Sequence, residues 1–174
     1  MQTEKWGEPA WTFLHSVTYG CPEVTTASDR EHYKSLFEVL TKTLPCSHCR
    51  DSYTKLFHFI DIDDFIDTRD GLTYWLFVIH NLVNRKLERE TEHYLNICLR
   101  YEENRAKCGN KDADEEKYNK CKQNLPPIDV DAIKKRVDAT YKKYIPIMTR
   151  HLNNYYNSPD NVDAGYVSCS LRTK

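Results

Sequence analysis

The sequence predicts an all-α fold: a compact bundle of four or five helices with a C-terminal helical extension. Apolar residues recur every three or four positions along most of the 174 residues, which is the spacing of a helix face packed on a core. No stretch alternates apolar and polar residues long enough to indicate a sheet. The chain has only 5 glycines, which argues against a glycine-rich nucleotide-binding fold and a loop-rich all-β fold.

Three helices are predicted in the first third of the chain. Pro22 ends the first helix, and Ser28 is a candidate N-cap for the second. Leu44 and Pro45 interrupt the chain again, so that the third helix begins at Cys46. The expected ranges are 11–19, 28–43 and 46–59.

Three more helices are predicted in the rest of the chain. An acidic link leads to Gly71, after which the clearest helical periodicity begins, and Pro126 and Pro127 break the chain before the last helix. The expected ranges are 72–90, 92–106 and 129–155. We therefore divide the chain into a helical bundle at 1–106, a charged linker flanked by cysteines at 107–126, and a helical extension with a flexible tail at 127–174.

Charge and hydropathy argue against two classes of partner. The formal net charge is -1, so the chain has no general electrostatic attraction to nucleic acid. No apolar run approaches the roughly 20 residues that a membrane-spanning helix needs. The first residues, Met1 to Trp6, have neither a signal-peptide nor a transit-peptide pattern. We expect a soluble chain without a cleavable leader.

The cysteines give the strongest indication of chemistry. There are 7 of them, an odd number that leaves at least one thiol unpaired within the chain. Cys46 and Cys49 form a Cys-x-x-Cys pair at an expected helix start, where the helix dipole favours a thiolate. The pair suits a reversible redox disulfide. Its alternatives are half of a zinc site, a thioredoxin-type site that needs a preceding strand, and two inert buried thiols.

Two further groups of side chains share helix faces. His80 and Asn84 lie one turn apart with Asn81 beside them, and inside an apolar helix they need polar partners or a heterocyclic ligand. Trp11 and His15 have the same spacing. Taken alone, each group fits packing contacts between helices at least as well as it fits a bound ligand.

Taken together, the three groups resemble the Erv/ALR family of FAD-linked sulfhydryl oxidases. The order and spacing of the motifs carry the resemblance, which covers about residues 6–106. Trp6-Gly7 and the Leu-Pro-Cys-x-x-Cys context look most like the versions carried by large DNA viruses. The motifs are Gly7-Glu8-Pro9-Ala10-Trp11-Thr12-Phe13-Leu14-His15, then Pro45-Cys46-Ser47-His48-Cys49, then Trp75 with His80-Asn81-Leu82-Val83-Asn84-Arg85-Lys86-Leu87.

The resemblance implies a helical bundle that binds FAD at one end, beside the redox disulfide, and a role for each matching residue. Cys46 is then the cysteine that meets the substrate thiol, and Cys49 the one that donates electrons to the flavin. No metal ligand is assigned. The cofactor-binding residues implied are Gly7, Trp11, His15, Tyr19, Cys49, His80, Asn81, Val83, Asn84, Lys86 and Tyr94.

The resemblance also implies partners. Protein dithiols, including a thioredoxin-like carrier, are the expected substrates, molecular oxygen is the electron acceptor, and the protein is a homodimer. A viral enzyme of this kind works in the host cytoplasm or the virion, and a cellular one in the mitochondrial intermembrane space. A helical interaction module that binds zinc through Cys46, Cys49 and histidines is the alternative function.

The sequence departs from the family pattern in three places. Cys21 stands where an aromatic residue often precedes the proline after the first helix, which weakens Tyr19 as a cofactor contact. Cys108 and Cys121 are our choice for a structural disulfide, with a shuttle pair as the alternative, and Cys169 is either a relay or a passive thiol. The helix expected at 129–155 has no counterpart in the family pattern.

Overall fold

The computed structural model describes residues 3–103 and 128–159. The all-α prediction is confirmed, because these residues form six α-helices and one 3-10 turn, with no strand among them. The expectations for Cys108, Cys121, Cys169 and the linker at 107–126 lie outside the described residues. The elements are α1 (Thr3–Tyr19), α2 (Ala27–Thr43), α3 (Ser47–Phe59), η1 (Ile62–Asp64), α4 (Arg69–Lys86), α5 (Tyr94–Glu103) and α7 (Val130–Asn157).

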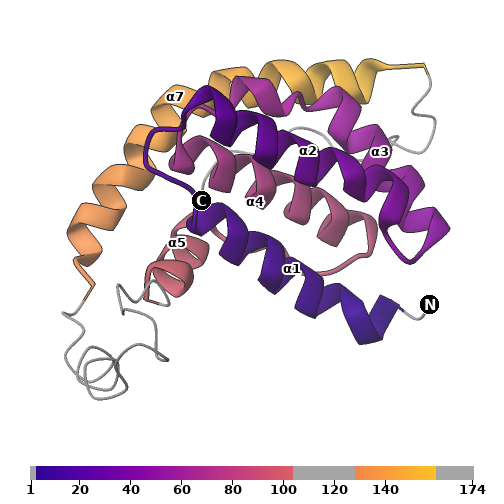
Figure 1. Ribbon diagram of the computed structural model, residues 1–174, viewed down its shortest axis with the longest axis horizontal. Coiled ribbons are helices and arrows are strands. Elements are labelled where there is room, and N and C mark those ends of the chain that lie inside the picture. Colours follow the sequence, from indigo (N-terminus) through magenta and orange to yellow (C-terminus); the bar gives the residue numbers. More distant parts are fainter. Residues whose placement is uncertain (1–2, 104–127, 160–174) are drawn as a thin grey trace.

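Helix α4 is the centre of the bundle (Figure 1). It packs against α1 on one side and against α7 and α5 on others, while α2 packs against α3. Its residues from Gly71 to Leu76 are all buried, and Trp75, whose Nε1 donates to the carbonyl oxygen of Ile60 at 2.9 Å, is fully enclosed. A helical stretch that is buried on all sides belongs in the interior of a bundle.

Capping residues explain where two helices begin. Helix α2 starts after Thr26 rather than Ser28, because Thr26 and Asp29 form a reciprocal capping box. Helix α4 starts at Arg69 rather than Leu72, because the Thr68 side chain accepts a hydrogen bond from the Gly71 N–H. The predicted start of the first helix was also too late: α1 begins at Thr3 and includes Pro9.

Helix α7 packs on the bundle and shares its core, although its segment was expected as a separate extension. Ile133, Val137, Met148 and Leu152 are buried in the same apolar cluster as α4. The helix bends part-way along its length (Figure 1), and Pro146, which has no N–H to donate to the preceding turn, lies inside it. Among residues 3–103 and 128–159, no helix is long and apolar enough to span a bilayer.

Gly71 sets how closely α7 approaches α4. A Cβ at this position would lie 2.1 Å from the Phe65 carbonyl oxygen and 2.6 Å from the Tyr144 hydroxyl. The Tyr144 hydroxyl fills that space and bonds to Asp67 Oδ1 at 2.8 Å and to Thr68 Oγ1 at 2.8 Å. The missing side chain therefore lets α7 bond to the segment that starts α4.

Candidate active site

A cavity of about 430 Å³ opens between α1, the start of α3, the end of α4 and α5. Its volume lies in the range of about 300–1,000 Å³ typical of small-molecule sites. Aromatic side chains form much of its wall, and Arg89, Arg100 and Lys86 add positive charge. The cavity therefore combines flat apolar surfaces with cationic groups.

The dithiol lies at one end of this cavity. Cys46 is the N-cap of α3, and its Sγ accepts a hydrogen bond from the Cys49 backbone N–H at 3.4 Å. Cys49, in the first turn of α3, lines the cavity, whereas Cys46 is not part of its wall. All four cysteines in the described part of the chain are free thiols. The two thiols of the pair thus differ in position: one faces the cavity and the other faces outward.

Hydrogen bonds between the two cysteines shift the pKa values of their thiols in opposite directions. Donation from the Cys49 thiol, and then from the Cys49 backbone N–H, lowers the pKa of Cys46 below its usual value. Burial, followed by donation to Cys46, raises the pKa of Cys49. Cys46 is therefore the more acidic thiol of the reduced pair, as expected at a helix N-terminus.

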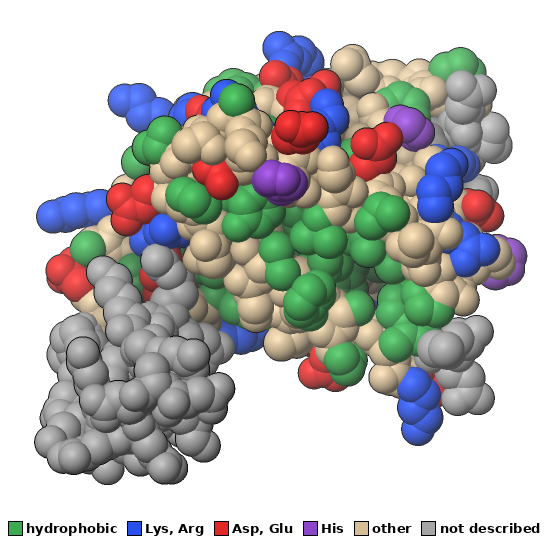
Figure 2. All heavy atoms as spheres, in the orientation of Figure 1, with side chains coloured by type: hydrophobic (Ala, Val, Ile, Leu, Met, Phe, Trp, Pro, Cys, Tyr) green, Lys and Arg blue, Asp and Glu red, His purple; other side chains and the backbone are tan. Residues whose placement is uncertain are grey.

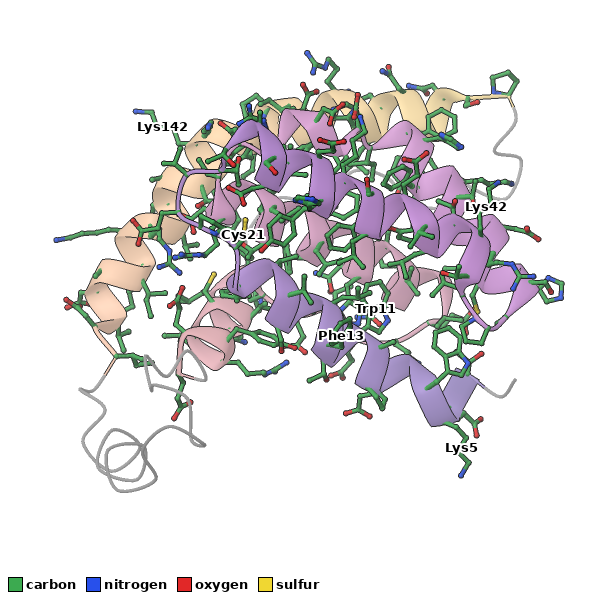
Figure 3. All side chains as sticks on the ribbon, viewed as in Figure 1. Lys5, Trp11, Phe13, Cys21, Lys42 and Lys142 are labelled. Carbon is green, nitrogen blue, oxygen red and sulfur yellow. The ribbon has the colours of Figure 1, made fainter. Side chains whose placement is uncertain are left out.

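Two histidines and a tryptophan occupy the other end of the cavity. Trp11 on α1 (Figure 3) stacks on His80 of α4, with ring centroids 4.1 Å apart and planes 9° from parallel. His15 Nε2 lies 3.1 Å from His80 Nδ1. Burial, the neighbouring His80 and Arg100 lower the pKa of His15 to about 3, and burial lowers the pKa of His80 to about 4. Both imidazoles are neutral near pH 7, so one nitrogen of the contact donates and the other accepts.

Two polar atoms of the cavity wall have no partner. Trp6 Nε1 and His15 Nδ1 are buried, and neither makes a hydrogen bond within the described part of the chain. Buried polar groups are nearly always paired, so that an unpaired one marks a place for a ligand. A flat heterocycle with edge acceptors and phosphate groups matches these unpaired atoms, the stacked rings and the cationic residues. The residues present therefore fit FAD.

Most of the residues expected at the cofactor lie together, and three do not. Asn81 instead exchanges two hydrogen bonds with the Glu92 backbone, at 2.9 and 3.1 Å. Tyr19 donates to Cys98 Sγ at 3.3 Å, and the fully buried Tyr94 shares a hydrogen bond with Thr73. These three side chains lie outside the cavity wall and form hydrogen bonds with other parts of the bundle. The expected residues that line the cavity are Gly7, Trp11, His15, Cys49, His80, Val83, Asn84 and Lys86.

Several wall residues were not among those assigned to cofactor binding from the sequence. Tyr101 stacks on His15 with centroids 5.2 Å apart, and Tyr19 stacks behind Tyr101 at 5.1 Å. Arg100 forms a bidentate pair with Glu92, at 3.1 and 2.8 Å. Trp6 was also missed, although its spacing from Thr3 and Ala10 indicates a shared helix face.

Comparison with known proteins identifies a family for most of the bundle. A sequence model described as the Erv1 / Alr family matches residues 8–105. A probable FAD-linked sulfhydryl oxidase of Acanthamoeba polyphaga mimivirus is 35% identical over 85 residues, which are 48% of this chain and 59% of that protein. The FAD-linked sulfhydryl oxidase ERV1 of Arabidopsis thaliana is 30% identical over 84 residues, 48% of this chain and 43% of that protein. The chain thus spans about half the length of the curated relatives it matches.

A solved structure gives the same fold for the bundle. The FAD binding domain of Erv1 from Saccharomyces cerevisiae is similar with a TM-score of 0.56 and 25% identity, over 59% of this chain and 96% of that domain. The family match ends at residue 105, so it does not include α7.

The lowered pKa values of His15 and His80 determine how they contribute to the pH dependence of stability. The folded pKa values of His15 and His80 lie below the usual 6.5. The unfolded chain therefore binds more protons than the folded one between about pH 4 and 6.5, and stability falls as the pH falls through this window. We expect His15→Gln to reduce the slope of unfolding free energy against pH by up to about 1.4 kcal/mol per pH unit. Urea unfolding between about pH 4.5 and 7 measures this slope.

The exposed His32 on α2 provides the control. His32→Gln should leave the slope as it is in the wild type. A slope in His15→Gln equal to that of the wild type would contradict the description of His15 as a buried neutral imidazole.

Proposed function

The chain belongs to the Erv1 / Alr family, and on that premise we propose that it is an FAD-dependent sulfhydryl oxidase. It forms disulfides in dithiol substrates and reduces oxygen to hydrogen peroxide. One observation carries the proposal: the inner thiol of a Cys-x-x-Cys pair lines a cavity of stacked aromatic rings that also holds two unpaired buried polar atoms. An interaction module would need neither the cavity nor an inward-facing thiol.

The two cysteines divide the exchange chemistry between them. The substrate thiolate attacks Cys46 Sγ of the Cys46–Cys49 disulfide, the S–S bond breaks, and Cys49 leaves as a thiolate. A second substrate thiolate attacks the substrate sulfur of the mixed disulfide, so that the substrate disulfide forms and Cys46 is released. The lowered pKa of Cys46 makes it the better leaving group in this second step. Cys49, on the cavity wall, is the cysteine that meets the cofactor.

FAD, when bound, would supply the two-electron redox chemistry that links oxidation of the cysteine pair to reduction of oxygen to hydrogen peroxide. Trp11 and His80 offer a stacked aromatic wall, and His15 offers an unpaired ring nitrogen. We assign to cofactor binding the wall residues Gly7, Trp11, His15, Cys49, His80, Val83, Asn84 and Lys86. Tyr19, Asn81 and Tyr94 are left out of this set, because their polar atoms bond within the bundle.

Lys86 serves the dithiol end of the cavity in this proposal. It lines the cofactor cavity, and its Nζ donates to Ser52 Oγ on α3 at 2.5 Å. Its charge also lowers the pKa of Cys49, against the larger opposing effect of burial. Lys86 would therefore stabilise the Cys49 thiolate that is released when substrate attacks Cys46.

The substrates proposed are protein dithiols, including a thioredoxin-like carrier, since Cys46 is the thiol that faces outward. The relatives include both a mimivirus protein, at 35% identity, and a yeast mitochondrial protein, at 28%. For the zinc alternative, no group of three or more histidine, cysteine or acidic side chains placed to hold a metal occurs in the described ranges. Nothing in the described site therefore favours that alternative.

Oxygen uptake with a small dithiol tests the function directly. The purified protein should retain FAD and consume oxygen with formation of peroxide. Cys46→Ser and Cys49→Ser should each retain less than about 1% of the rate, because each removes one sulfur of the exchange pair. Cys98→Ser is the matched control, because Cys98 is buried against Tyr19 and lies outside the cavity wall. It should keep the rate, and an undiminished rate in Cys49→Ser would contradict the assignment.

We also propose that the protein is a homodimer through α1 and α2. Phe13 on α1 is 60% exposed and Val39 on α2 is 48% exposed. Figure 2 shows hydrophobic side chains gathered over the face where these two helices lie. Exposed apolar patches often mark association sites. Sedimentation should therefore give twice the 20.6 kDa chain mass, and Phe13→Asp should shift it towards the monomer; a wild-type monomer at micromolar concentration would exclude the dimer.

A further inference from the structure

Trp6 is one of the two cavity-wall residues with a buried polar atom that the described part of the bundle does not pair. Its Nε1 is buried and has no hydrogen-bond partner in the described part of the chain. Trp75 shows the ordinary alternative, because its Nε1 donates to the Ile60 carbonyl oxygen at 2.9 Å. An indole N–H is only a donor, so the partner that Trp6 requires must be an acceptor.

The position of Trp6 on α1 fixes which end of the cavity it faces. Thr3 precedes it by one helical turn, and Thr3 Oγ1 lies 4.0 Å from Cys49 Sγ. Residues three apart share a helix face, and both Thr3 and Trp6 line the cavity. Trp6 therefore lies at the dithiol end, whereas Trp11 and His15 reach the end that carries His80.

The dithiol end must hold the part of the cofactor that accepts electrons. This step rests on the proposed function, since Cys49 can deliver electrons only to a ring system next to it. The isoalloxazine ring of FAD has two carbonyl oxygens and the nitrogens N1 and N5 along its edge, which accept hydrogen bonds, whereas its N3–H donates one. The adenine and phosphates would lie further along the cavity, away from Trp6.

We propose that the Trp6 Nε1–H donates a hydrogen bond to an acceptor atom on the isoalloxazine edge of bound FAD. The bond gives the buried indole N–H its missing partner. It also draws electron density from the ring, which makes the ring easier to reduce by Cys49. Trp6 is thus a cofactor-binding residue that tunes the ring, and its role differs from stacking, which needs no N–H.

Trp6→Phe in the flavin-loaded protein tests this role, because it keeps an aromatic ring and removes the donor. The expected result is a shift of the visible flavin bands and of the flavin carbonyl vibrations in Raman spectra, with a lower reduction potential. Ser16→Ala is the control on the same helix, since Ser16 is exposed and does not line the cavity. Unchanged bands and potential in a Trp6→Phe protein that carries FAD would overturn the proposal.

A second measurement uses the wild-type protein and does not depend on how the variant folds. The three tryptophans are labelled with ¹⁵N, and their indole N–H signals are followed while the bound flavin is reduced without oxygen. Reduction adds electron density to the acceptor, so the Trp6 proton should move downfield while the Trp75 proton stays. A stationary Trp6 signal would overturn the proposal, and a wild-type protein that binds no flavin would overturn the oxidase function on which it rests.

Discussion

The N-cap position of Cys46 is the constraint on which the rest of the site depends. Its extended backbone, φ -113° and ψ 125°, ends the loop from α2, and Cys49 follows in the first helical turn. This geometry lets the Cys49 backbone N–H bond to Cys46 Sγ and turns the Cys49 thiol inward to the cavity. Arg50, which donates to the Leu44 carbonyl oxygen, and Tyr53, which donates to that of Phe37, fasten the start of α3 to α2. The cap thus sets both which thiol is acidic and which one faces the cofactor site.

The helices around the cavity serve to hold its two ends at a fixed distance. Helix α1 runs from Thr3, beside Cys49, to His15, beside His80. Helix α4, enclosed by α1, α5 and α7, carries His80 and Lys86 on its last turns. Helix α7 contributes no cavity residue, and its ion pairs with Asp64 and Asp67 are partly exposed and stabilise little. Burial of the apolar face of α7 contributes more to stability than these ion pairs do. Helix α7 thereby stabilises the position of α4.

The sequence was sufficient for the fold class and pointed to some of the residues that line the cavity from α1, α3 and α4, but not to Trp6. Periodicity indicated the helices, but the competition between neighbouring caps, Thr26 against Ser28, depends on side-chain geometry that spacing does not determine. Helix α1 extends before Pro9 to Thr3, although proline ordinarily disfavours a helix interior. Asn81 and Tyr94 have side chains that could bind a cofactor. In the structure, Asn81 instead bonds to the segment after α4, and Tyr94 is buried in the core. Which polar groups satisfy one another inside a bundle follows from tertiary contacts, and so spacing alone does not reveal that Tyr19, Asn81 and Tyr94 bond within the bundle.

The visible absorption spectrum during anaerobic titration with a dithiol tests the central claim, that Cys49 passes substrate electrons to a flavin in this cavity. The wild-type protein should lose its flavin absorption as dithiol is added and recover it when air is admitted. Cys49→Ser should retain the yellow colour and fail to bleach, because FAD remains bound while its electron donor is absent. A Cys49→Ser protein that bleaches as the wild type does would contradict the account.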